Sequence, residues 1–140
     1  MSLPAPQPGL VISYAYLWAR EHDRGAEEGI KDRLCAIVAA RQVIEGREVV
    51  TVADHAHAAG GSLDAVETPA ALKKHLGLDN LPSWIVVSET NDFLWPGSDL
   101  RPRRGITPAL FDYGMLPPRF FAHVRDRILQ AHLRRVPRSE

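Results

Sequence analysis

Two apolar segments joined by a short turn constrain the fold of this chain more than any other feature. The segment "LCAIVAARQV" (residues 34–43) is a nearly continuous apolar run, which predicts a strand buried on both faces. The segment "EVVTVAD" (residues 48–54) predicts a second strand, with a glycine-containing turn between the two. Because so short a connection cannot cross over a sheet, the two strands are expected to pair antiparallel as a hairpin.

The other apolar segments favour further short strands around this hairpin. "GLVISYAYLWA" (residues 9–19) and "SWIVVSETNDFLW" (residues 83–95) are rich in β-branched and aromatic residues, and each predicts one strand. Residues 20–33 are charged, lack apolar periodicity and contain two glycines, so they predict a long exposed loop. A further short strand is possible within residues 96–108. We therefore expect a small curled sheet or barrel and no parallel βαβ unit.

Two helices are predicted after the hairpin. In the first, Thr68 is expected to be the N-cap, Pro69 the first helical residue and Gly77 the stop. The second is expected within "YGMLPPRFFAHVRDRILQAHLRRV" (residues 113–136), with two prolines at its start. Its apolar stripe, which should contact the sheet, consists of Phe120, Phe121, Val124, Ile128, Leu129 and Leu133.

The chain of 140 residues has the size of one domain. Residues 1–8 predict a flexible proline-rich lead-in, residues 9–135 a single domain and residues 136–140 a tail. Lys plus Arg and Asp plus Glu each number 17, so composition gives no support for a broad attraction to nucleic acid or membranes.

A single cysteine, Cys35, makes a disulfide within the chain impossible and favours a reducing compartment. No apolar run approaches the roughly 20 residues of a membrane-spanning helix. The N-terminal segment has neither the basic nor the apolar region of a signal peptide. We therefore expect a cytoplasmic protein that does not contact a membrane.

Four short segments, taken in order, carry a resemblance to a known family. They are "KDRLCAIV", with Arg33 and with Leu34 in place of a proline, then "VADHAHA", "VVSETNDFLW" with Glu89, and "YGMLPPRFFAHVRDRIL". As an ordered set, from Gly9 to about Leu129, they resemble the PemK/MazF family, the toxins of type II toxin–antitoxin modules.

The resemblance implies a fold, an activity and partners. The fold would be a small SH3-like antiparallel β-barrel with a short internal helix and a C-terminal helix, working as a homodimer. The activity would be metal-independent endoribonuclease cleavage of single-stranded RNA by an mRNA interferase that inhibits growth. The partners would be single-stranded RNA and a cognate antitoxin protein, and no cofactor or metal is implied.

Arg33 and Glu89 are the first two candidate catalytic residues. Cleavage through the 2′-hydroxyl needs a cation on the phosphate and groups that move protons, and a guanidinium holds a phosphate in a fork without losing its charge. By resemblance Arg33 is the catalytic arginine and Glu89 acts in proton transfer. The alternatives are a solvated arginine at the start of a strand, and a surface carboxylate or a partner for Arg33.

The stretch "VVTVADHAHAAGG" (residues 49–61) departs from the family pattern. Ala56 falls where nucleases of the family carry a threonine or serine, and loss of such a contact costs about 2.7 to 4 kcal/mol of transition-state stabilisation. His57 is the predicted catalytic substitute and His55 a predicted substrate contact, because an imidazole exchanges protons near neutral pH. Asp54 could orient one of the imidazoles.

Other readings of this stretch stay open. The two histidines could be a loop pair without chemistry. They could also hold a metal, although two ligands are too few for a stable zinc site. His22 and Lys31, from the charged loop, are further predicted substrate contacts, with a solvated loop histidine as the alternative for His22.

Two other functions are compatible with the sequence. A catalytically inactive barrel could bind a protein segment or nucleic acid without cutting, which the alanine at position 56 would explain. A gyrase poison would rest on fold-level analogy alone.

Overall fold

The computed structural model describes residues 5–16, 33–42, 47–56, 64–78, 81–96, 100–103, 110–131 and 134–137. These residues form one nine-stranded sheet and two helices, so the predicted mainly β fold with helices is confirmed. None of the described helices has the length and apolar character needed to cross a membrane.

The elements follow one another along the chain with short strands throughout. They are β1 (Leu10–Tyr14), β2 (Arg33–Gln42), β3 (Glu48–Ala56), β4 (Ala65–Glu67), α2 (Ala70–His75), β5 (Trp84–Val86), β6 (Glu89–Trp95), β7 (Leu100–Arg101), β8 (Asp112–Met115), α3 (Pro118–Gln130) and β9 (Arg134–Pro137).

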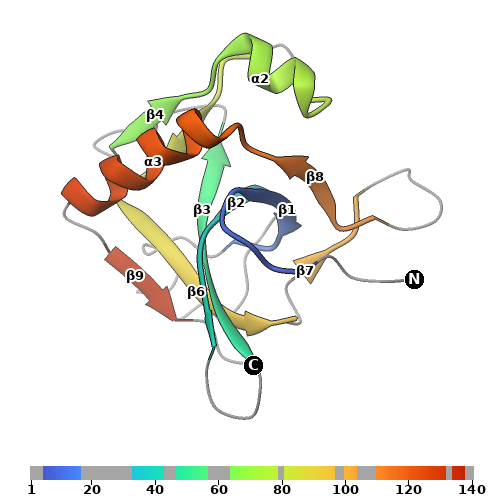
Figure 1. The fold of residues 1–140 in the computed structure, drawn as a ribbon, viewed down its shortest axis with the longest axis vertical. Coiled ribbons are helices and arrows are strands. Elements are labelled where there is room, and N and C mark those ends of the chain that lie inside the picture. Colours follow the sequence, from blue (N-terminus) through green and yellow to red (C-terminus); the bar gives the residue numbers. More distant parts are fainter. Residues whose placement is uncertain are drawn as a thin grey trace.

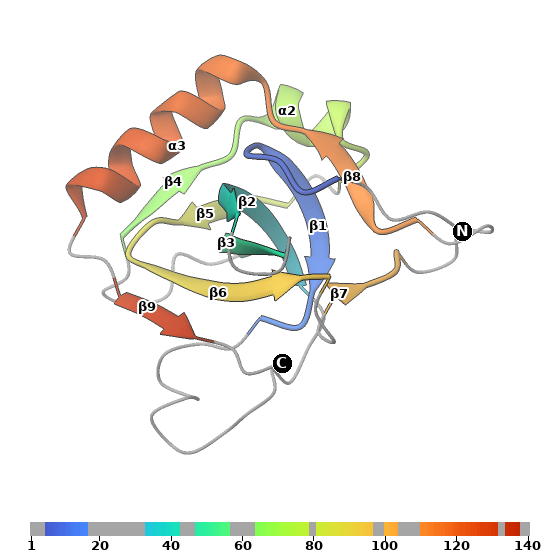
Figure 2. The same cartoon turned by 60° about the horizontal axis from the view of Figure 1, so that its bottom comes forward.

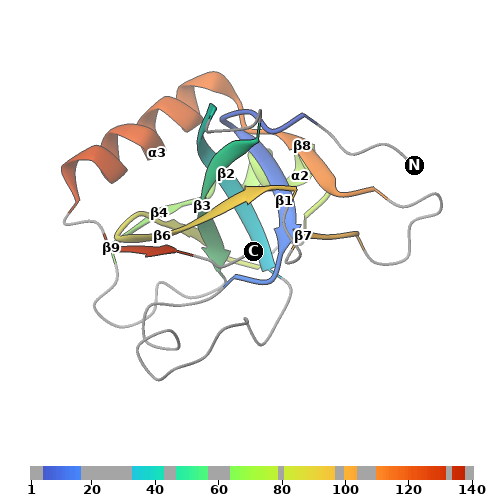
Figure 3. The ribbon, with the colours of Figure 1, turned by 90° about the horizontal axis from the view of Figure 1, so that it is seen from below.

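Strands β1, β2 and β3 lie side by side in the centre of the sheet (Figure 3). The predicted hairpin of β2 and β3 is confirmed as antiparallel, with Cys35 opposite Asp54. Both β5 and β6 pair with the outer edge of β3, and both β7 and β8 pair with the outer edge of β1. Among the described strands no pairing joins these two edges, so the curled sheet is open in this part of the chain.

The curl gives the sheet an interior face and a helix-covered face, because successive side chains of a strand point to opposite sides. The interior face carries Leu10, Ile12, Tyr14, Tyr16, Cys35, Ile37, Val50, Val52, Val86, Phe93, Trp95 and Leu100. The helix-covered face carries Val11, Ala36, Ala53, Val66, Ile85 and Val87, which form one core cluster with side chains of α2 and α3. Both helices lie on this side of the sheet (Figures 1 and 2). Burial of β2 on both faces is confirmed between Cys35 and Ile37.

A β-bulge changes the alternation within β2. Ile37 lies opposite Val52, but Ala39 lies opposite Thr51, so β2 holds one extra residue at Val38. Interior residues are therefore odd-numbered before the bulge and even-numbered after it, as Ala40 on the interior face illustrates. The bulge fixes the face on which the first residues of β2 lie.

The prediction of one strand over residues 83–95 is wrong, because the structure divides this segment into β5 and β6. Six positions separate Ile85 from Asn91, whereas their partners on β3, His55 and Val52, are three apart. The extra residues let β5 turn away to pair with β4, and the Val87 N–H is bonded to the Asp64 carbonyl at 2.9 Å. The unbroken apolar run "WIVV" gave no signal of this break.

The predicted cap of α2 is also wrong. The N-cap is Pro69, no side chain caps the helix, and the Thr68 hydroxyl is bonded to His55 instead. The predicted stop at Gly77 is confirmed. This residue has a φ of +72°, and its N–H is bonded to the Lys74 carbonyl.

The C-terminal helix is shorter than the sequence indicated. It begins at Pro118 as predicted but ends at Gln130, and Leu129 of the expected apolar stripe is 76% exposed. Leu133 lies outside the described residues. Strand β9 follows and pairs parallel with β6, with Val136 fully buried. Strand β9 thus includes residues 136 and 137, the first two residues of the expected tail.

Candidate functional site

Four polar side chains meet at one end of the interior face. Arg33 starts β2, Asp54 lies near the end of β3, Glu89 starts β6 and Tyr16 follows β1. Because these strands run antiparallel, the ends named lie at the same edge of the curl. Alternation then turns all four side chains inward, next to Cys35 and Val52. We call these four residues the polar end.

Arg33 and Asp54 form an ion pair across the hairpin. Arg33 Nη1 lies 3.6 Å from Asp54 Oδ2, with 29% of the arginine side chain exposed and none of the aspartate. Leu34 pairs with His55 and Cys35 with Asp54, so Arg33 reaches Asp54 diagonally along the interior face. The guanidinium therefore connects a fully buried carboxylate to the surface.

Glu89 brings a second carboxylate to Asp54. The β3–β6 pairing ends with Val52 opposite Asn91, and two further residues in the same register bring Asp54 to Glu89. Only 6% of Glu89 is exposed, so the alternative interpretation of this residue as a surface carboxylate is excluded. Its Oε2 accepts a hydrogen bond from the Tyr16 hydroxyl at 3.3 Å.

Burial and charge shift the proton affinity of Asp54. Removal from water raises the pKa of its carboxyl to about 7, and the nearby Glu89 raises it as well. The Arg33 guanidinium and the backbone N–H of His55 act in the opposite direction but do not outweigh burial. Asp54 is thus able to change its charge near neutral pH, which an ordinary aspartate does not do.

Tyr16 is a permanent donor in this cluster. Burial, followed by the negative charge of Glu89, raises the pKa of its hydroxyl well above the usual 10. The phenol therefore keeps its proton at all physiological pH values and donates it in a hydrogen bond to Glu89. A carboxylate that accepts such a bond is stabilised in its ionised form.

The polar end combines one guanidinium with two carboxylates. The guanidinium of a partly exposed arginine is suited to bind an anion such as a phosphate oxygen. A carboxyl with a pKa near 7 can both accept and donate a proton at neutral pH. The set is therefore chemically able to bind a phosphodiester and to exchange protons beside it.

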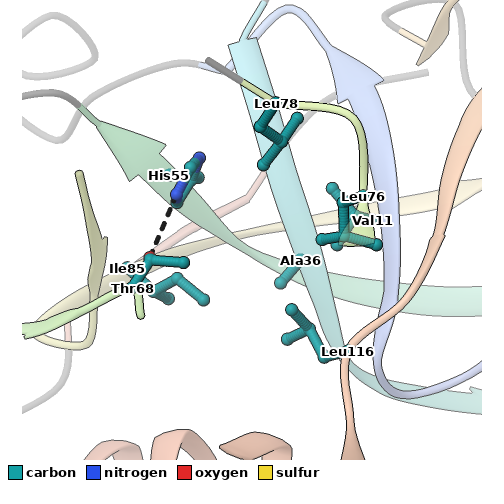
Figure 4. A pocket seen from close by; sticks show the side chains of 8 residues that line it. All are labelled: Val11, Ala36, His55, Thr68, Leu76, Leu78, Ile85 and Leu116. Atoms are coloured by element: carbon teal, nitrogen blue, oxygen red, sulfur yellow. Dashed lines mark hydrogen bonds between the residues drawn. The ribbon is translucent and has the colours of Figure 1, made fainter. Parts of the chain in front are cut away.

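His55 lies on the opposite face of the sheet from this cluster. Its Nε2 is hydrogen-bonded to Thr68 Oγ1 at 3.0 Å, above a pocket lined by apolar side chains of β1, β2 and the loop after α2 (Figure 4). The enclosed space is about the size of one water molecule. Asp54 therefore does not orient the imidazole of His55, because neighbouring strand residues point to opposite sides. His57, the other imidazole that Asp54 could orient, lies outside the described residues.

Three of the predicted site residues, His57, His22 and Lys31, lie outside the described residues. Ala56 is the last residue of β3 and is paired with Trp84. Across the described part of the chain, no three His, Cys, Asp or Glu side chains come together in a way that could hold a metal ion.

Sequence reasoning missed Tyr16 as a site residue and gave Asp54 only a supporting role. Asp54 did carry a signal, because it occupies the interior position two residues after Val52 in an apolar strand, where an acidic residue needs a partner. Tyr16 follows Ile12 and Tyr14 at the same period of two, but "LVISYAY" does not distinguish it from a core aromatic residue.

Comparisons of the chain with protein-family models, with curated proteins and with solved structures found no match.

Proposed function

We propose that this protein is a metal-independent endoribonuclease that cuts single-stranded RNA, as a toxin of the PemK/MazF kind. The observation that supports the proposal best is the convergence of Arg33 and Glu89, far apart in sequence, at the polar end. Between them lies Asp54, whose carboxyl has a pKa of about 7. The SH3-like barrel, the homodimer and the control by an antitoxin belong to the same proposal and rest on the resemblance.

In this proposal Arg33 binds the non-bridging oxygens of the scissile phosphate. The 2′-oxygen attacks phosphorus and the bond to the 5′-oxygen breaks, which leaves a 2′,3′-cyclic phosphate and a 5′-hydroxyl. A base takes the proton of the 2′-hydroxyl and an acid returns one to the 5′-oxygen. Arg33 stabilises the charge that grows on the phosphate, a contribution worth at least about 100-fold in rate.

Glu89 is the proposed proton-transfer group among the described residues. Tyr16 holds it by a hydrogen bond at 3.3 Å, which fixes the orientation of its carboxylate. The role of His57 in the same step remains a prediction of the sequence.

A second candidate function is binding without cleavage. The burial of both Asp54 and Glu89 favours it, since proton-transfer groups must reach the substrate to act. In that case Arg33 would contact RNA or an acidic protein segment at the surface, and the carboxylates would only hold the arginine.

The two candidates differ in a cleavage assay with a long single-stranded RNA, run with and without a chelator. The variants are Arg33→Ala and Glu89→Gln, and the matched control is Arg125→Ala, which removes an arginine from the exposed side of α3. The first proposal predicts chelator-resistant cutting that falls at least about 100-fold in both site variants and stays unchanged in the control.

Cutting that survives Arg33→Ala would contradict the proposed mechanism. Absence of cutting by the native protein, together with RNA binding that Arg33→Ala weakens, would favour the binding function instead.

A further inference from the structure

The polar end holds fewer positive charges than carboxylates. Among the described residues, the groups that face Asp54 are Arg33 and Cys35 from β2, Glu89 from β6, Tyr16 after β1 and the N–H of His55 on its own strand. Only one of them, the guanidinium, is a cation. With both carboxylates ionised, these described groups would hold two negative charges against one positive charge in a buried place, which is unfavourable.

Asp54 also lacks the hydrogen bonds that a buried carboxylate needs. Within the described part of the chain neither Oδ1 nor Oδ2 has a hydrogen-bond partner of good geometry, although the backbone N–H of His55 lies near enough to lower the pKa of the carboxyl. Arg33 Nη1 lies 3.6 Å from Oδ2. Glu89, by contrast, accepts a bond from Tyr16. When the two carboxylates together carry one proton, that proton is therefore bound to Asp54.

We propose that Asp54 is the positioning residue of Arg33 and that a proton on its carboxyl decides whether the guanidinium is held inward or presented to an anionic ligand. This inference rests on the proposed function in one respect, namely that the ligand is the phosphate of RNA. The geometry of the switch itself does not depend on the ligand.

The two states follow from the contacts. With Asp54 ionised, the carboxylate draws Arg33 Nη1 toward the interior and competes with any external anion. With Asp54 protonated, the ion pair is lost and the guanidinium gains from pairing with a phosphate at the surface. Binding of the phosphate and uptake of the proton therefore favour each other.

The size of the effect follows from the fraction of protein in the protonated state. For a carboxyl that titrates at about pH 7, this fraction falls about tenfold between pH 6 and pH 8. The dissociation constant for RNA should rise by the same factor.

The first test is a titration of the native protein by nuclear magnetic resonance, without any ligand. The carboxyl carbon of Asp54 and the Nε–Hε pair of Arg33, assigned with Asp54→Asn and Arg33→Lys, are followed from pH 5 to pH 9. We expect both signals to shift with one common midpoint near neutrality. An Asp54 midpoint near 4, or an Arg33 signal that does not move with Asp54, would overturn the inference.

The second test measures the affinity for a single-stranded RNA that carries 2′-O-methyl groups and cannot be cleaved. The native protein should lose about tenfold in affinity between pH 6 and pH 8. Asp54→Asn, which mimics the protonated state, should bind at pH 8 as tightly as the native protein binds at pH 6. The control Asp64→Asn changes an exposed carboxylate that pairs with Arg127 on the helix-covered side, and should keep the native slope.

The outcomes separate the switch from the function. Coupled titration of Asp54 and Arg33 without RNA binding at any pH would support the switch and contradict the RNA function. RNA binding with an equal pH slope in the native protein and Asp54→Asn would contradict the switch and leave the RNA function in place.

Discussion

The guanidinium of Arg33 lies 3.6 Å from the carboxylate of Asp54, although the first is 29% exposed and the second is completely buried. The two residues belong to neighbouring strands of the central hairpin and share its interior face. An ion pair of this kind couples the protonation of a core residue to the charge that the surface presents.

Removal of the cation should make stability depend on pH. Arg33→Ala leaves the buried carboxylate of Asp54 without its cation, so we expect a loss of about 1 to 3 kcal/mol in unfolding free energy at pH 8. The loss should be smaller at pH 5.5, where Asp54 is already protonated. Urea denaturation at both pH values tests this, with Arg125→Ala expected within about 0.5 kcal/mol of the native protein. An equal loss at both pH values would argue against the ion pair.

Removal of the Asp54 carboxyl should make the unfolding free energy depend less on pH. The pKa of Asp54 is about 7 in the folded protein against 3.8 in the unfolded chain, so the folded state binds the proton more tightly. Its contribution to stability is complete below pH 3.8 and is lost as the pH rises through 7. Asp54→Asn should therefore change little between pH 5 and pH 8.5, while the native protein loses roughly 2 to 4 kcal/mol.

Urea denaturation across this pH range compares the native protein with Asp54→Asn and with Asp64→Asn, the exposed control. If the native and Asp54→Asn curves ran parallel, the raised pKa of Asp54 would be refuted.

Loss of the Tyr16 hydroxyl removes a hydrogen bond to Glu89 and should lower the stability of the protein. Tyr16→Phe removes a buried donor at 3.3 Å and leaves the carboxylate without it, at a cost of about 1 to 3 kcal/mol. Tyr113→Phe is a suitable control, because its ring contacts Arg103 from 4.1 Å and that contact is kept. A Tyr16→Phe protein as stable as the control would show that the hydrogen bond contributes nothing.

The hydrogen bond between His55 and Thr68 should matter for stability alone. Thr68→Val keeps the shape of the side chain and removes the hydroxyl, so we expect a loss of about 0.5 to 1.5 kcal/mol. Cleavage and binding of RNA should stay unchanged, because His55 and Arg33 lie on opposite faces of the sheet. Reduced RNA cleavage at native stability would instead assign His55 to the site.

Local sequence patterns predicted much of the fold. The apolar runs of β2 and β3 and the turn between them predicted the central hairpin, and Gly77 marked the end of α2. The break between β5 and β6 was not predictable, since it depends on the pairing of β5 with β4, which is a tertiary contact. The end of α3 was missed for a similar reason, because β9 is defined by its pairing with β6.

Two of the four residues of the polar end, Arg33 and Glu89, were singled out from the sequence by the resemblance to the PemK/MazF family, and their catalytic roles stay predictions. Arg33 and Glu89 start their strands, and the structure brings both to the polar end. Asp54 and Tyr16 could be assigned to the polar end only from the strand register, because the register determines which side chains they face.

The extra residue at Val38 in β2 has a consequence for the evolution of this protein. Deletion of that one residue would restore an unbroken ladder and, with the hairpin turn fixed, would move Arg33 to the side of α2 and α3. Substitutions along this strand can be selected one at a time. A single-codon insertion or deletion, by contrast, moves every interior side chain on one side of the bulge to the helix-covered face at once. Homologous sequences that keep the same site should therefore differ here in residue type but not in length.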